Sequence, residues 1–191
     1  INKMSKADKK NIHNKIYKKV AQYIFNFGLK GWNMDQLAAE TGMAKNTLYK
    51  IIGYKEDMIR EVYLNKIKSI HNNLSKLINK DSEYFETLHQ LGKIFLDIVK
   101  YTETRQAREI FLEYPAVENE VNNIKDQINN KIIIFLNKGI KNNYLKKDKE
   151  GRFYFELILA LAFYYIKEND NINVEQTFQK ALDSLIIGIK K

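Results

Sequence analysis

The stretch "NMDQLAAETGMAKNTLYKIIGYKEDM", residues 33–58, decides the fold, because its pattern is that of two short helices separated by a glycine. Asn33 offers a side-chain cap, and Gln36 occupies the capping-box position three residues later, which predicts a helix over 34–40. Gly42 ends that helix, and a second one is expected over 44–51, before Gly53. Two short helices joined in this way are a helix-turn-helix candidate.

The two expected helices divide their side chains between an inner and an outer face. Four residues are spaced to pack the helices together: Leu37, Ala38, Met43 and Leu48. Four polar residues near the start of the second helix are left facing outward: Lys45, Asn46, Thr47 and Lys50. A recognition helix meets the base edges of the major groove with side chains in these positions. The pattern therefore favours DNA contact over a merely solvated surface.

Three further residues are expected to support DNA binding. Lys55 begins the next helix, where free backbone N–H groups and the helix dipole favour an anion, so we expect its ammonium to bind a DNA phosphate. Tyr49 combines an apolar ring with a hydroxyl that can reach the DNA backbone, and Asn33 is included among the expected contacts. Ala44 lacks a capping side chain, which costs roughly 1 kcal/mol at the start of the second helix.

Positive charge is concentrated in the first third of the chain. The net charge is +9; residues 1–60 hold 12 Lys or Arg against 5 Asp or Glu, and residues 61–191 hold 20 against 18. This asymmetry is typical of a polyanion-binding unit attached to a nearly neutral body. A lysine-rich, solvated surface is the alternative, and charge alone does not decide between them.

These residues resemble the N-terminal DNA-binding segment of the TetR family of transcriptional repressors. The elements that match in register are Leu37-Ala38, Gly42, Thr47-Leu48-Tyr49, Gly53 and Lys55. The match covers about residues 10–60, and the joint spacing is more specific than any single element. Four positions depart from the family pattern: Trp32, Ala44, Ile52 and Tyr54.

The resemblance implies an all-α homodimer with a ligand cavity among the middle helices. It further implies a ligand-responsive regulator, most simply a repressor, that binds a pseudo-palindromic operator as a dimer and is released by a small, mostly apolar effector. A DNA-binding protein of the same fold that is controlled by a protein partner is the first alternative. A helical interaction protein whose basic end meets a membrane surface is the second.

Composition and periodicity independently predict an all-α fold. One proline and eight glycines provide few of the turns that an all-β chain needs. Nine helices are expected, over about residues 8–27, 34–40, 44–51, 55–81, 88–98, 107–114, 121–140, 151–167 and 174–190, and Pro115 is expected to stop the sixth. We expect a DNA-binding domain over 1–54 and a ligand-binding and dimerisation domain over 55–191.

The second expected domain offers candidates for a dimer interface and for a ligand pocket. The run "FYFELILALAFYYI", residues 153–166, is apolar around nearly its whole circumference, so we expect it to be buried on two sides. The expected interface residues are Leu157, Leu161, Tyr165, Leu182, Leu185, Ile186 and Ile189. The candidate pocket residues are Phe95, Tyr101, Phe111, Tyr114, Phe135, Tyr154 and Phe163, although a core position is the better interpretation for any one of them.

The sequence disfavours several other classes of protein. Cysteine is absent, and the three histidines, His13, His71 and His89, show no metal-binding spacing, so no metal site and no cofactor are predicted. Phosphate loops, HExxH motifs and serine elbows are also missing, which makes an enzyme the least favoured class. The longest apolar run has 14 residues, too few to span a bilayer. We expect a cytoplasmic protein.

Overall fold

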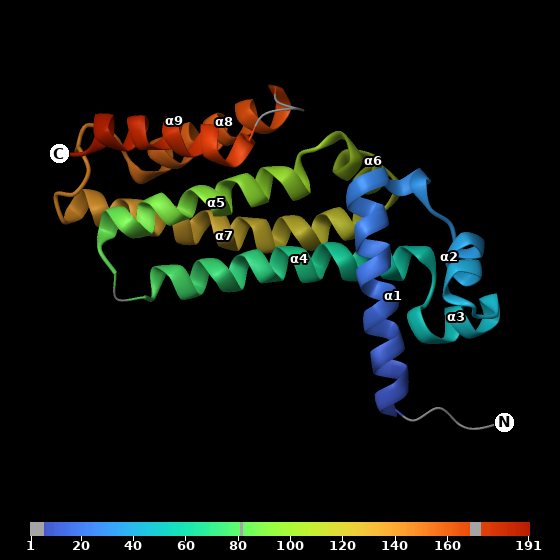
Figure 1. The fold of residues 1–191 in the computed structure, drawn as a ribbon. Helices are drawn as coiled ribbons and strands as arrows, with labels where there is room; N and C mark the ends of the chain where they lie inside the picture. Colours follow the sequence, from blue (N-terminus) through green and yellow to red (C-terminus); the bar gives the residue numbers. More distant parts are fainter. Residues whose placement is uncertain (1–5, 81, 169–172) are drawn as a thin grey trace. The chain divides into compact units, whose positions relative to one another are not determined.

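A computed structural model describes residues 6–80, 82–168 and 173–191, and these residues are almost entirely helical (Figure 1). They form nine α-helices and one short 3-10 helix, η1, which confirms the predicted all-α class. The helices are α1 (Lys6–Phe27), η1 (Leu29–Gly31), α2 (Met34–Thr41), α3 (Lys45–Ile52), α4 (Lys55–Ile78), α5 (Tyr84–Thr102), α6 (Arg105–Glu113), α7 (Pro115–Lys141), α8 (Gly151–Glu168) and α9 (Val174–Ile189).

The described residues pack into two compact units. The first contains the residues up to Lys66 together with Arg105–Val121, and the second contains Ile67–Thr104 and Asn122–Lys191. The helices α4 and α7 therefore contribute residues to both units. The expected functional boundary after residue 54 stays a prediction, because compact packing does not show which residues bind DNA or a ligand.

The first unit is built around apolar stripes at helical spacing. On α1, Ile16, Val20 and Ile24 are buried, and they pack among side chains of the neighbouring helices. Helix α1 contacts α3, η1 and α6 within this unit. Trp32, which we identified only as a departure from a family pattern, is one of the largest fully buried side chains of the protein. The short helices α2 and α3 therefore pack in an apolar core that includes residues of α1 and Trp32.

Pro115 has the expected role and a second one. Helix α6 ends at Glu113, before Pro115, as predicted. Pro115 is also the first residue of α7, which begins six residues before the expected position near Val121. Proline suits the first position of a helix, where its fixed φ is helical and its missing N–H would have had no partner. The helix therefore extends over Val117, which is fully buried.

The second unit contains a group of three helices, α5, α8 and α9, that pack on one another. Phe95 and Phe178 are among its fully buried aromatic side chains. The chain end is joined to the segment after α7, since Leu145 and Lys190 form an isolated β-bridge. None of the helices formed by the described residues has the length and apolar character needed to cross a membrane.

Candidate functional site

The turn between α2 and α3 has the geometry that the sequence predicts. Gly42 has a φ of 65°, in the left-handed region, and the Met43 N–H donates to the carbonyl oxygen of Ala38 at 3.1 Å. This bond and the glycine conformation are those of a Schellman helix end. Helices α2 and α3 contact each other, and Leu37 on α2 and Leu48 on α3 are fully buried.

The outer face of α3 carries the polar residues that we expected there. Lys45, Asn46, Thr47 and Lys50 are all exposed, and Tyr49 is half-buried. Lys45 already has a partner, because its Nζ lies 2.6 Å from Asp35 Oδ1 on α2. That hydrogen bond raises the pKa of Lys45. The acidic Asp35, which sequence reasoning did not connect to this face, is therefore part of it.

The caps of the two short helices agree with the sequence. Asn33 Oδ1 accepts a hydrogen bond from the backbone N–H of Gln36 at 2.8 Å, so the predicted cap of α2 is confirmed. Ala44 precedes α3 in an extended conformation and provides no side-chain hydrogen bond. The predicted weakness at the start of α3 is confirmed in this respect. Since Asn33 Oδ1 is occupied by the cap, mainly its amide N–H groups remain for another contact.

The side chain of Lys55 makes hydrogen bonds within the protein. Its Nζ donates to the carbonyl oxygens of Leu29 at 2.6 Å and Trp32 at 2.7 Å, and it lies 4.6 Å from the centroid of the Trp32 ring. Burial lowers the pKa of Lys55. The side chain thus ties the start of α4 to the segment between α1 and α2. Sequence reasoning missed this role, because no local pattern connects residues separated by 23 and 26 positions.

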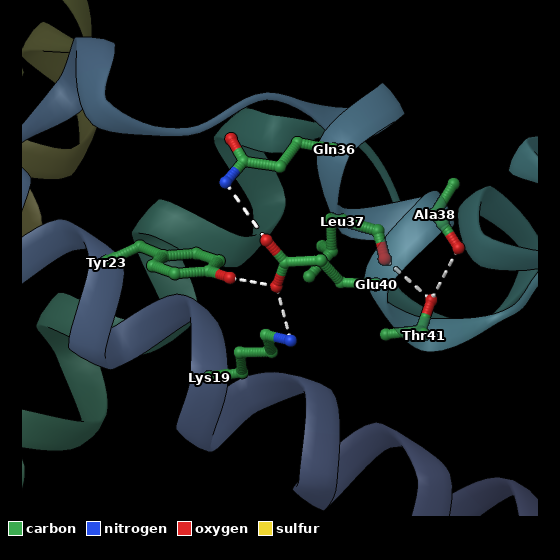
Figure 2. A network of polar contacts seen from close by, with 7 residues as sticks. All are labelled: Lys19, Tyr23, Gln36, Leu37, Ala38, Glu40 and Thr41. Atoms are coloured by element: carbon green, nitrogen blue, oxygen red, sulfur yellow. Dashed lines mark hydrogen bonds and ion pairs between the residues drawn. The ribbon is translucent and has the colours of Figure 1, made fainter.

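A polar network joins α1 to α2 (Figure 2). Glu40 accepts hydrogen bonds from Tyr23 and from Gln36 Nε2, the latter at 3.0 Å, and forms an ion pair with Lys19. These contacts, with Lys19 the largest contributor, lower the pKa of Glu40 to about 2. Thr41 Oγ1, drawn beside them, donates to the Leu37 carbonyl oxygen at 2.7 Å.

Two tyrosines lie beside the exposed face of α3. The rings of Tyr49 and Tyr54 are 5.2 Å apart, and Tyr54 is 71% exposed, although it is a large aromatic side chain. An exposed aromatic residue next to a polar, positively charged helix face is suited to contact a sugar-phosphate backbone. The departure at Tyr54 therefore adds a candidate contact that we did not predict.

The second unit contains two pockets large enough for a small molecule. The first, of about 530 Å³, is lined by Asn73, Leu77, His89, Gln90, Lys93, Ile94, Asp97 and Gln179. The second, of about 600 Å³, is lined by Ser75, Ile78, Asn79, Lys80, Ser82, Tyr84, Thr87, Lys131, Ile134, Phe135, Lys138, Asn142 and Tyr144. Both volumes lie in the range of ligand sites.

The seven candidate pocket aromatics are dispersed. Phe135 lines the larger pocket, and the other six line neither of these two hollows. Phe95 packs against Phe155, with ring centroids 5.5 Å apart. The remaining candidates lie on several helices: Tyr101 on α5, Phe111 on α6, Tyr154 and Phe163 on α8, and Tyr114 between α6 and α7. A ligand role for these residues stays a prediction.

The candidate interface residues fall into two groups. Leu182, Ile186 and Ile189 are buried in the core of their own chain, which the apolar periodicity of α9 alone could not distinguish from burial against a partner. Leu157 is exposed, and Leu161, Tyr165 and Leu185 are half-buried. Four large apolar side chains of α8 and α9 are conspicuously exposed: Phe153, Leu157, Tyr164 and Ile187.

Comparisons with known proteins place this fold among transcriptional regulators. No family model matches the chain, and no curated protein sequence matches it. Solved structures do match over nearly the whole chain, at low sequence identity.

The ketosteroid transcriptional regulator KstR2 of Mycobacterium tuberculosis is 16% identical, with a TM-score of 0.74 over 94% of this chain and 95% of that one. A putative transcriptional regulator from Saccharomonospora viridis, in complex with choline, is 16% identical, with a TM-score of 0.73 over 95% and 99%. A TetR/AcrR-family regulator from Thermobifida fusca is 17% identical, with a TM-score of 0.72 over 95% and 100%. This chain therefore has the fold of the TetR family of transcriptional regulators.

Proposed function

We propose that this protein is a DNA-binding transcriptional regulator, acting as a repressor on a pseudo-palindromic operator. The observation that carries the proposal is the exposed polar face of α3, which a buried contact and a Schellman turn hold against α2. A recognition helix needs this combination of a rigid support and exposed hydrogen-bonding side chains. The excess of positive charge in residues 1–60 supports the same interpretation.

The side chains of α3 divide into two roles in this proposal. Asn46 and Thr47 would contact base edges and choose the sequence, while Lys50 and Tyr49 would flank the groove. Lys45 would leave Asp35 when DNA binds, because the many phosphates of the duplex attract its ammonium more strongly than one exposed carboxylate does. Breaking the ion pair with Asp35 costs free energy, so Asp35 should weaken DNA binding.

A phosphate contact by Lys55 remains part of the proposal in a restricted form. An ammonium group has three N–H donors, and two of them are directed at the carbonyl oxygens of Leu29 and Trp32. One donor is left for a phosphate oxygen. Lys55 would then contribute to DNA binding both directly and by holding the start of α4 in place.

Dimerisation would bring two recognition helices onto one duplex. The exposed apolar side chains of α8 and α9 are suited to a two-fold symmetric contact with the same helices of a second chain. In that arrangement Leu157, Leu161, Tyr165 and Leu185 contact the partner, whereas Leu182, Ile186 and Ile189 support the interface from the core. Half-sites would be separated by about 34 Å or a multiple of that distance.

A small, mostly apolar effector would release the dimer from DNA. The two hollows of the second unit supply space for it, and a protein of the same fold has been captured with choline. The helices α4 and α7 contain residues of both units, so a change in their position can be transmitted along continuous helices. A tenfold loss of DNA affinity requires a differential effector affinity of only about 1.4 kcal/mol.

Selection from a random duplex library, followed by fluorescence anisotropy on the enriched sequence, tests the proposal. We expect enrichment of a two-fold symmetric sequence and a specific affinity at least about a thousandfold above that for random duplex at physiological salt. Asn46→Ala should change the preferred sequence, and Glu113→Gln, on an exposed face of α6, should leave it unchanged. Enrichment of no sequence would reject the proposal, and equal retention on anionic vesicles would favour a membrane-surface protein.

A further inference from the structure

We propose that the larger pocket of the second unit binds an amphipathic organic anion, a molecule with a negatively charged head and an apolar body. The pocket has a volume of about 600 Å³ and lies where the end of α4, the start of α5 and the second half of α7 meet. Its lining residues combine positive charge, aromatic surface and unpaired hydrogen-bonding capacity. Each of these features selects one part of such a ligand.

Among the described residues that line this pocket, the charged side chains are all of one sign. Lys80, Lys131 and Lys138 line it, and none of the described residues that line it is acidic. Lys131 Nζ is held by Ser75 Oγ at 2.8 Å, which fixes the ammonium without neutralising it. Three ammonium groups around one hollow repel one another and attract an anion. The head group of the ligand is therefore negatively charged.

The apolar part of the pocket is a stack of aromatic rings. Tyr84 is stacked on Phe135, with ring centroids 4.7 Å apart, and on Tyr144, with centroids 4.8 Å apart. Ile134, at 67% exposed, and Tyr144, at 43% exposed, add apolar surface that is accessible to solvent. Covering this surface with an alkyl or aromatic body removes it from water, which favours binding.

One polar group of the described wall has no partner, and it packs against Gly139, so Tyr84 has to shift for this group to reach an oxygen atom of a ligand. The Tyr84 hydroxyl is buried and has no hydrogen-bond partner among the described residues, and burial raises its pKa, so it keeps its proton. A buried donor without an acceptor costs free energy, which an anionic oxygen can recover. Thr87 is buried and pairs with Ser82 at 2.9 Å, so one of these two hydroxyls donates its proton to the other.

The smaller pocket shows that this charge pattern is not general for the unit. Its lining contains Asp97 as well as Lys93 and His89, so both signs of charge face the same hollow. Lys93 also lies 3.8 Å from Glu175 Oε1 on α9. An anion entering the smaller pocket would meet a carboxylate, whereas the described lining of the larger pocket presents it with lysines and no carboxylate.

The wall of the larger pocket is also held in place. Tyr144 belongs to the segment after α7, and its carbonyl oxygen accepts a hydrogen bond from the Lys191 N–H at 3.2 Å. The adjacent Leu145 forms the β-bridge with Lys190. A pocket with a fixed wall loses less conformational entropy when a ligand binds. This inference identifies the ligand class of the proposed regulator and rests on that proposal for its effector role, but binding itself does not require DNA.

Titration calorimetry of the full chain with dodecanoate and with dodecyltrimethylammonium, both below their micelle concentrations, tests the site. The two probes have opposite head charges and apolar tails that differ by a single carbon. We expect dodecanoate to bind about tenfold or more tightly than the cation. The double variant Lys80→Gln/Lys138→Gln should lose about tenfold in dodecanoate affinity, and Lys68→Gln, an exposed lysine of α4 outside the pocket, should lose less than about twofold.

Folding is not expected to limit this test, because Lys80 and Lys138 are exposed, and thermal melting of the variants checks it. The single variant Lys131→Gln, which keeps a hydrogen-bonding group near Ser75, gives a second measurement. Equal affinity for the two probes, or an unchanged dodecanoate affinity in both pocket variants, overturns the inference. Selective dodecanoate binding by a chain that selects no DNA sequence supports the site and rejects the proposed regulator, whereas the reverse result rejects only the site.

Discussion

Lys55 donates a hydrogen bond of 2.7 Å to the carbonyl oxygen of Trp32 and lies 4.6 Å from the centroid of the same residue's ring. A second bond, to the Leu29 carbonyl oxygen, completes the contact. The lysine at the start of α4 is thus part of the support of the helix-turn-helix, and its effect on DNA binding has to be separated from its effect on folding.

We predict that Lys55→Ala lowers the free energy of unfolding by about 1–3 kcal/mol, because it leaves two carbonyl groups without their charged donor. It should also weaken binding to every DNA sequence and reduce the slope of log affinity against log salt by about one. Urea denaturation and anisotropy at several salt concentrations measure the two effects. Lys50→Ala, on the exposed face of α3, is the control and should affect DNA binding with a stability change below about 0.5 kcal/mol. Unchanged stability in Lys55→Ala would show that the two hydrogen bonds contribute nothing net.

Breaking the ion pair between Lys45 and Asp35 should increase DNA affinity, in contrast to the loss expected for Lys55→Ala. Asp35→Asn releases Lys45 and removes a negative charge from the face that meets DNA, so we expect binding to tighten by roughly two- to fivefold. The gain should shrink as salt rises. In a Lys45→Ala background, adding Asp35→Asn should increase DNA affinity by less than it does in the parent chain, because Lys45 is no longer there to be released. Equal gains in both backgrounds would mean that Asp35 acts only through its charge.

Stability at acidic pH should depend on Glu40. Its pKa falls from the usual 4.5 to about 2 in the folded protein, chiefly through Lys19, so the folded state binds fewer protons than the unfolded state. The contribution of ionised Glu40 is therefore complete above about pH 4.5 and is lost as the pH falls through about 2. Thermal melting from pH 2 to 7 should show a shallower decline for Glu40→Gln than for the parent chain. Glu113→Gln, which changes an exposed carboxylate of the same unit, should preserve the parent slope.

Local signals explain most of what the sequence could predict. Asn33, Gly42 and the buried Leu48 act within a few residues, and apolar periodicity located the helices closely. Contacts between distant segments left no such signal. Nothing near Lys55 in the sequence indicates a carbonyl oxygen at Leu29, and nothing near Glu40 indicates a tyrosine on α1.

The candidate ligand and interface residues show the same limit. An apolar stripe predicts that residues are buried, but not whether their own chain or a partner covers them. From the sequence alone, Leu182 could therefore lie in the core or in an interface, and in the structure it is buried in its own chain. The larger pocket is assembled from α4, α5, α7 and the segments beside them, and among the seven candidate aromatics only Phe135 lines it. Its lysines stood among 32 Lys and Arg residues, without any pattern that singled them out.

Gly139 gives a prediction about the wall of that pocket. A Cβ atom at this position would lie 2.0 Å from the Tyr84 hydroxyl, so Gly139→Ala must displace the tyrosine that stacks on Phe135 and Tyr144. Overpacking of this kind costs about 1–3 kcal/mol, more than the gain that alanine usually brings to a helix. Gly188, next to the last residue of α9, is the control, since an added Cβ meets nothing within 4 Å, and Gly188→Ala should change stability by less than about 0.5 kcal/mol. Urea denaturation of the two variants measures both changes. An unfolding free energy that does not fall in Gly139→Ala would mean that Tyr84 moves away from Gly139 at no cost.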